Sequence, residues 1–328
     1  MKTFTTWLLR LFGVVALVAG AGLAYLFARY PAVPAPEDVH IQATPERLAR
    51  GQYLVENVVG CVLCHADREW TQYSAPVIAS TKGKGGQRFG YGAEPFVLYA
   101  KNITSGGVGD WTDGELLRAI TMGVSRDGTP LFPLMPYPRY ARMSREDVEA
   151  IVAYLRTLPA VPTQTLPART LDFPLSLIVR TIPATPSHRP VPAAADRAAY
   201  GEYLVNAAVC ADCHTPMDDQ GAPLVGMAFA GGTAFSPNGI GLVRSANLTA
   251  DAGTGIGTWT EDQFVEKFRA FRGVLPRTLS GAERLQNTEM PWTYYAGMRD
   301  DDLRAIYTYL RSLPPVVHRV EKFGNPAQ

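Results

Sequence analysis

The longest hydrophobic segment of the chain covers residues 11–28, which include no charged side chain. Lys2 and Arg10 precede this segment and Arg29 follows it. Its length reaches the threshold for crossing a bilayer as a helix. A cleaved signal peptide is the alternative, because Ala19 begins an Ala-Gly-Ala run that resembles a cleavage site, although the hydrophobic region of a signal peptide is usually shorter. We favour an uncleaved transmembrane helix, and both interpretations export the rest of the chain.

Elsewhere the apolar positions follow the period of amphipathic helices. Thr44 is a favourable N-cap and Pro45 suits the first helical position, which predicts a helix from there. Ser144 should cap a second helix, and three aspartates at 300–302 favour the start of a third. The predicted fold class is therefore mainly α. The apolar stripes that define the last two helices are Val148, Ile151, Val152 and Leu155 in one, and Leu303, Ile306, Tyr307 and Leu310 in the other.

Many features occur twice, at a period near 150 residues that suits a duplicated domain. Gly51 and Gly201 both lie inside helical patterns, where glycine costs about 1 kcal/mol relative to alanine. Close approach of another helix would explain both glycines. The second copy has additional residues between Trp259 and Met290, so its loop over the predicted site is longer. The paired segments are 51–55 with 201–205, 102–104 with 247–249, 111–113 with 259–261, 135–136 with 290–291, and 154–159 with 309–314.

The repeat divides the chain into four parts. We expect 1–40 to be a membrane anchor or signal segment with a Pro-rich spacer, 41–163 the first domain, 164–192 a Pro-rich linker, and 193–328 the second domain. The linker contains an apolar patch at 173–179, which is too short to span a membrane. We expect the linker to dock on the surface of a domain.

Composition narrows the class of function. The chain has 328 residues, of which 47% are hydrophobic, and a formal net charge of +1. A nucleic-acid-binding protein would show a strong basic excess, so we expect no nucleic-acid partner. Residues 82–88 are basic and glycine-rich but lack the spacing of a phosphate-binding loop, which predicts a flexible surface loop.

The four cysteines form two copies of the pattern Cys-x-x-Cys-His. Cys61 and Cys64 precede His65, and Cys210 and Cys213 precede His214. This pattern attaches a c-type haem, whose two vinyl groups react with the two thiols while the histidine binds the iron. A zinc site or a redox dithiol is the alternative for a Cys-x-x-Cys pair alone. Two copies, each followed by histidine and with no cysteine left over, favour two covalently bound c-type haems.

Each haem iron then needs a sixth ligand or an open site. Met135 and Met290 are the candidates, because each precedes proline at an equivalent place in its repeat and a thioether is a soft ligand for haem iron. Met143 and Met298 also occupy equivalent positions, eight residues further on. They stand just before a predicted helix and suit packing, so we expect them in the core.

These motifs together resemble tandem class I cytochrome c domains over about residues 44 to 316. The most similar proteins are the c-type cytochrome subunits of membrane-bound alcohol, aldehyde and gluconate dehydrogenase complexes. The resemblance implies that the first and last helices of each domain cross, near Gly51 with Tyr154 and near Gly201 with Tyr309. That family usually carries three haems, whereas this chain has motifs for two.

The expected function is electron transfer by a membrane-anchored dihaem cytochrome without catalysis of its own. Its donor would be a periplasmic or membrane dehydrogenase or a quinol-linked complex, and its acceptor a terminal oxidase or a soluble cytochrome. The expected location is the cell inner membrane, with a single span and both haem domains on the periplasmic side. The alternative is a dihaem enzyme, such as a peroxidase or a thiosulfate dehydrogenase, which would need one iron with an exchangeable site.

Overall fold

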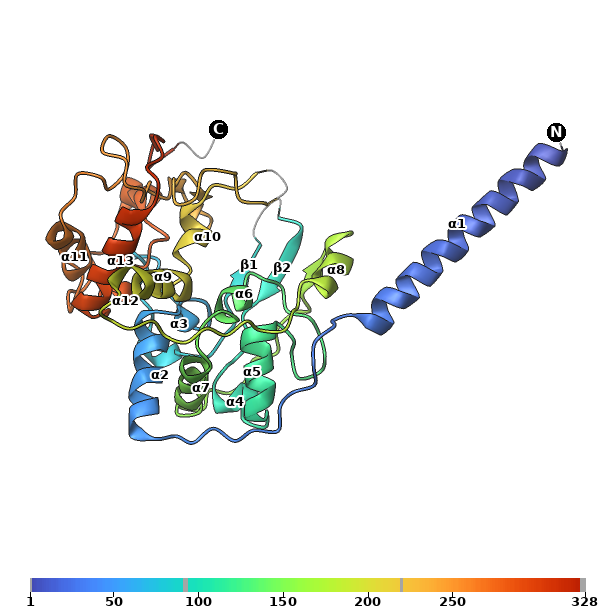
Figure 1. Ribbon diagram of the computed structural model, residues 1–328, viewed down its shortest axis with the longest axis horizontal. Coiled ribbons are helices and arrows are strands. Elements are labelled where there is room, and N and C mark those ends of the chain that lie inside the picture. Colours follow the sequence, from blue (N-terminus) through green and yellow to red (C-terminus); the bar gives the residue numbers. More distant parts are fainter. Residues whose placement is uncertain (1, 91–93, 219–220, 325–328) are drawn as a thin grey trace.

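A helix that stands apart from the rest of the molecule begins the computed structural model, which describes residues 2–90, 94–218 and 221–324. Helix α1 (Lys2–Arg29) extends away from the body, and from Thr3 onward its side chains are exposed apart from partial cover of Leu26 (Figure 1). Among the described residues it is the one helix that is long and apolar enough to cross a membrane. Residue 1 of the predicted anchor and residues 325–328 of the predicted second domain lie outside the described residues.

The first half of the body is built from short helices around one crossing pair. Helix α2 packs against α7, while β1, β2 and β3 form an antiparallel sheet in that order. Arg88 lies opposite Tyr99, and Phe96 lies opposite Leu171. The elements are α2 (Pro45–Asn57), α3 (Cys61–Cys64), β1 (Arg88–Phe89), β2 (Phe96–Tyr99), α4 (Ser105–Val108), α5 (Asp113–Met122), α6 (Tyr137–Tyr140), α7 (Arg145–Leu155), and then β3 (Thr170–Leu171) and α8 (Leu175–Ile178) from the linker.

The second half repeats this plan with α9 packed against α13. Its elements are α9 (Arg197–Ala207), α10 (Cys210–His214), β4 (Ala234–Phe235), β5 (Val243–Arg244), α11 (Glu261–Arg269), α12 (Trp292–Tyr295) and α13 (Asp300–Ser312). Strands β4 and β5 pair antiparallel. Short 3₁₀ turns occupy Ala79–Thr81, Val179–Thr181, Pro237–Gly239 and Gly281–Gln286. The fold is mainly α-helical with one N-terminal apolar helix, as the sequence predicts.

The helix ends follow the local signals. Thr44 Oγ1 accepts a hydrogen bond from the Arg47 amide, and Ser144 Oγ accepts one from the Asp147 amide. Helix α13 begins with its three aspartates, which complement the positive end of the helix dipole. The predicted caps at Thr44 and Ser144 are therefore confirmed.

The two glycines mark the helix crossings. A Cβ on Gly51 would lie 1.9 Å from the Ala150 carbonyl oxygen, and a Cβ on Gly201 would lie 2.0 Å from that of Ala305. The same added atoms would come within 3 Å of Cβ of Tyr154 and of Tyr309. No side chain larger than hydrogen fits at either crossing, so the crossings predicted at Gly51–Tyr154 and Gly201–Tyr309 are confirmed.

Gly51→Ala should therefore destabilise the protein by about 3 kcal/mol, the upper part of the range for overpacking a well-packed interior. Gly253→Ala is the matched control, because Gly253 is exposed and its added Cβ would meet Asp251 at an ordinary contact distance of 3.6 Å. Urea unfolding followed by circular dichroism would compare the two variants. Equal stability of Gly51→Ala and Gly253→Ala would contradict the close crossing.

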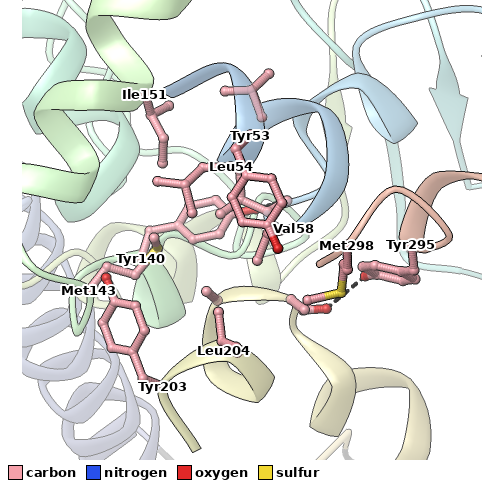
Figure 2. Packing of buried hydrophobic residues seen from close by; sticks show 14 of the residues in the cluster. Tyr53, Leu54, Val58, Tyr140, Met143, Ile151, Tyr203, Leu204, Tyr295 and Met298 are labelled. Carbon is pink, nitrogen blue, oxygen red and sulfur yellow. Dashed lines mark hydrogen bonds between the residues drawn. The ribbon is translucent and has the colours of Figure 1, made fainter. Parts of the chain in front are cut away.

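One hydrophobic cluster runs through both halves of the body. Tyr53 and Leu54 from α2 and Met143 before α7 lie in the same cluster as Leu204 from α9 and Met298 before α13 (Figure 2). The linker also packs on the body, since β3 extends the sheet and the Ser187 amide donates to the Ala141 carbonyl. The docking predicted for the linker is confirmed.

Candidate functional site

Each Cys-x-x-Cys-His run forms a single helical turn that follows the first helix of its half. Cys61 and Cys64 occupy the two ends of α3, and Cys210 and Cys213 lie in α10. Residues three apart on a helix share a face, so each thiol pair can react with one planar group on one side. The four thiols form no disulfide, and Cys213 is exposed.

A left-handed residue precedes each turn. Gly60 has φ +70°, and Val209, at the equivalent position of the second half, has φ +50°. A left-handed conformation is a marked outlier for a β-branched residue, and such strain costs on the order of 1–3 kcal/mol. It persists where the surrounding structure fixes the backbone, and here it directs the chain into α10.

The two histidines are oriented in the same way. His65 Nδ1 lies 2.6 Å from the Lys101 carbonyl oxygen, and His214 Nδ1 lies 2.8 Å from that of Ala246. A carbonyl can only accept, so Nδ1 carries the proton and Nε2 keeps its lone pair. Burial also lowers the pKa of both histidines, which favours the neutral ring. A neutral imidazole held through Nδ1 is prepared to bind a metal through Nε2.

The backbone of each histidine is hydrogen-bonded to a glycine. The Gly85 amide donates to the His65 carbonyl at 3.1 Å, and the Gly231 amide donates to the His214 carbonyl at 2.8 Å. A Cβ on either glycine would come within 2.5 Å of the peptide that supplies the carbonyl for Nδ1. We call these two contacts, the carbonyl at Nδ1 and the glycine amide at the histidine carbonyl, the backbone cradle of each histidine. The cradle requires glycine at this position.

This cradle corrects the prediction that residues 82–88 form a flexible surface loop. Gly83 and Gly85 are buried, and Lys82 and Lys84 pair with Glu56 and Asp67 at 2.7 Å. The sequence suggested a flexible loop because glycines and lysines are usual on surfaces. Here Gly85 allows close approach to the Lys101 peptide that holds His65, and Gly83 packs against Thr104 and Leu158.

The Met-Pro pairs lie in loops tied to the cysteine-bearing turns. Met135 and Met290 are half-buried and pack against the hydrophobic cluster. Tyr140, five residues after Met135, donates to the Val59 carbonyl, and Tyr295, five residues after Met290, donates to the Ala208 carbonyl at 2.8 Å. These tyrosines were missed in the sequence, although Met-Pro-x-x-x-Tyr occurs in both repeats.

The other repeated methionines are core residues, as predicted. Met143 is fully buried and Met298 is 2% exposed. Both belong to the cluster that joins the halves (Figure 2). Burial among apolar side chains gives them a packing role.

The two halves bind each other through equivalent residues. Tyr203 donates to Asp147 Oδ2 at 2.6 Å, and Tyr53 donates to Asp302 in the same way. Arg50 adds an ion pair to Asp147 at 2.7 Å. Each first helix therefore contacts the start of the last helix in the other half.

Each half also reaches the cysteine-bearing turn of the other. Arg139, four residues after Met135, donates to Asp212 between Cys210 and Cys213, with Nε 2.9 Å from the carboxylate oxygen. Tyr294, four residues after Met290, accepts from the Gly60 amide at 2.7 Å. The loop after each methionine thus binds both turns.

The additional residues of the second half join this interface. The Leu279 amide donates to the Thr71 carbonyl at 2.7 Å, and the Ser74 hydroxyl donates to the Met290 carbonyl at 2.8 Å. Arg68, three residues after His65, forms an ion pair with Glu289 at 3.2 Å. The longer loop predicted between Trp259 and Met290 therefore packs on the first half of the chain.

Contacts across this interface connect the surroundings of the two turns. Arg139 of the first half donates to Asp212 in the second turn, and Arg68, three residues after His65, pairs with Glu289, which precedes Met290. Each of these contacts joins a residue near one site to a residue near the other. The two candidate sites are therefore neighbours.

A hollow of about 400 Å³ opens beside the first site. Lys101, whose carbonyl holds His65, is part of its wall, together with Trp111, Ser125, Arg126 and Asp127. Across the described residues, no three His, Cys, Asp or Glu side chains gather as a metal ion would require. Two thiols on one turn with an oriented histidine fit a haem and are the arrangement of c-type cytochromes.

Comparison with known proteins confirms the resemblance to this class. No protein-family model matches the chain. It is 29% identical to the fructose dehydrogenase cytochrome subunit of Gluconobacter japonicus, over 95% of the chain and 60% of that protein. It is 31% identical to the alcohol dehydrogenase (quinone) cytochrome c subunit of Gluconacetobacter polyoxogenes, over 81% of the chain and 56% of that protein. A diheme cytochrome c-type protein of Cereibacter sphaeroides is 28% identical over 92% of the chain and 97% of its own length.

The chain is thus a homologue of cytochrome c subunits of dehydrogenase complexes and of a diheme cytochrome. It spans about 60% of the length of the dehydrogenase subunits with which it aligns. These relatives are named for cytochrome c and, in one case, for two haems.

Proposed function

We propose that the chain is a membrane-anchored dihaem c-type cytochrome that transfers electrons between a dehydrogenase or quinol-linked donor and an oxidase or soluble cytochrome. Its two tandem cytochrome c domains cover 41–163 and 193–328. Cys61 and Cys64 would hold one haem, and Cys210 and Cys213 the other. When bound, each haem supplies a one-electron couple between ferric and ferrous iron.

The observation that carries this proposal is the identical placement of the two histidines. His65 and His214 each present Nε2 because a backbone carbonyl takes the Nδ1 proton. The same arrangement occurs in both halves, and in each a glycine amide donates to the carbonyl of the histidine. Both halves can therefore hold a haem iron in the same way, and the choice between an electron carrier and a dihaem enzyme depends on the sixth ligand.

Met135 and Met290 would be the sixth ligands. The hydrogen bonds of Tyr140 and Tyr295 fix each methionine loop to the backbone two residues before the turn that bears its cysteines. A thioether on both irons leaves no exchangeable position, which favours electron transfer over catalysis. Contacts such as Arg139 with Asp212 would keep the two sites at a fixed separation.

Location and partners follow from the N-terminal helix and the relatives. Helix α1 (Lys2–Arg29) would remain as a single anchor in the inner membrane, with both haem domains on the periplasmic side, where c-type haem is attached. The names of the relatives support a dehydrogenase as the electron donor. No nucleic-acid partner is proposed.

The test is the ligand state of the purified holoprotein. Both ferric haems should be low spin, show the far-red charge-transfer band of thioether ligation, and resist cyanide and CO. Optical and paramagnetic resonance spectra with and without these ligands measure this directly. Binding of CO at one haem, or turnover of peroxide or thiosulfate at enzymatic rates, would favour the dihaem enzyme instead.

A further inference from the structure

An apolar surface on the linker has no role in the proposed electron transfer. Phe173 is 81% exposed and Ile178 is 49% exposed, at the two ends of the segment that contains α8 (Leu175–Ile178). The next residue, Val179, is 1% exposed and faces the body. The segment therefore presents one apolar side outward and packs with the other.

The position of this segment on the body is fixed. Strand β3 (Thr170–Leu171) immediately precedes it and pairs with β2, and the Asp172 amide donates to the Pro95 carbonyl at 2.9 Å. Phe173 is thus held at the edge of the small sheet. Its side chain is exposed although the backbone just before it is fixed by hydrogen bonds.

The same segment is attached to the end of the N-terminal helix. Arg180 Nη2 donates to the Tyr30 carbonyl at 2.7 Å, and the guanidinium lies 4.5 Å from the centre of the Phe27 ring. Figure 1 shows α8 on the side of the body from which α1 leaves. The exposed apolar surface therefore lies beside the point where the predicted membrane span ends.

We propose that Phe173 and Ile178 contact the lipid surface and give the protein a second attachment to the membrane beside α1. Aromatic and aliphatic side chains are favoured at the boundary between headgroups and acyl chains. Arg29 and Arg180 stand at the same end of α1, where cations meet anionic headgroups. This inference rests on the proposed anchor, since α1 brings the segment to the bilayer.

The consequence is a defined orientation of the haem domains. A body held by one helix can turn about that helix and tilt on the membrane. A second contact at Phe173 removes much of this freedom and presents the same face of the body to partners in the same membrane.

Photo-crosslinking in proteoliposomes tests the contact. The full-length holoprotein with Phe173→Cys would have one free thiol, because the four native cysteines are bound to haem. Benzophenone maleimide on this thiol, illuminated in phosphatidylcholine and phosphatidylglycerol vesicles, should give a mass increase of one lipid. Val317→Cys is the matched control, since Val317 is also 81% exposed but lies after α13, and it should give no lipid adduct.

Leu17→Cys in α1 separates this proposal from the anchor. Lipid adducts at positions 17 and 173 but not at 317 would support the second contact. An adduct at 17 alone would overturn it while leaving the anchor in place. Crosslinks from 173 to another protein chain would also overturn it, and absence of adducts at both 17 and 173 would contradict the anchor itself.

Discussion

Met135→His should lower the reduction potential of one haem while the protein keeps both haems, and Met290→His should do the same for the other. A thioether stabilises ferrous iron, whereas a second imidazole favours the ferric state. We expect a shift that is a sizeable part of the ~0.8 V range over which axial ligands set haem potentials. Spectroelectrochemical titration of each variant, with loss of the thioether band, measures the effect.

The two sites should not respond equally. The Met290 carbonyl accepts from Ser74 of the first half, and Glu289 beside it pairs with Arg68. Met290→His should therefore disturb the interface between the halves more than Met135→His does.

Met143→Leu and Met298→Leu are the controls. Both methionines are buried in the shared cluster, and a swap that conserves volume costs less than about 1.5 kcal/mol. Neither control should change a potential or the thioether band. Unchanged potentials in Met135→His, or a shifted potential in Met143→Leu, would contradict the ligand assignment.

Asp147→Ala should destabilise the protein by about 3 kcal/mol, the lower end of the range for breaking a buried ion pair. Asp147 is 4% exposed and accepts hydrogen bonds from Arg50 and from Tyr203 of the second half. Its removal leaves both donors without their partner and weakens the contact between the halves. We expect the lower end of this range because the Arg50 side chain is 24% exposed, so water can solvate its charge when Asp147 is removed.

Glu146→Ala is the matched control for this substitution. Glu146 also lies in the first turn of α7 but is exposed, so only its interaction with the helix dipole is lost, at a cost below about 1 kcal/mol. Chemical unfolding monitored at the haem and by circular dichroism compares the two variants. Similar unfolding midpoints would show that the Asp147 network contributes little.

The features that the sequence predicts well are those encoded by neighbouring residues. The cap at Ser144, the glycine crossings and the two cysteine-bearing turns depend on local pattern or on a repeat visible in the chain. The repeat also shows which histidines and methionines are equivalent. These signals are enough to predict the helices of each half, and they also name the candidate site residues.

The interface between the halves could not be predicted in the same way. Tyr53 and Asp302 are 249 residues apart, and nothing near either residue indicates the other. The length of the loop before Met290 is visible in the sequence, but its pairing with Thr71 depends on how the halves dock. The same holds for Gly85, whose role follows from the carbonyl of Lys101 that it approaches.

The central claim is that the chain binds two haems covalently, one on each cysteine-bearing turn. A pyridine haemochrome assay on protein of known concentration, combined with intact mass, measures this most directly. The account predicts two haems per chain that acid acetone does not extract. One haem per chain, or haem that acid acetone removes, would contradict it.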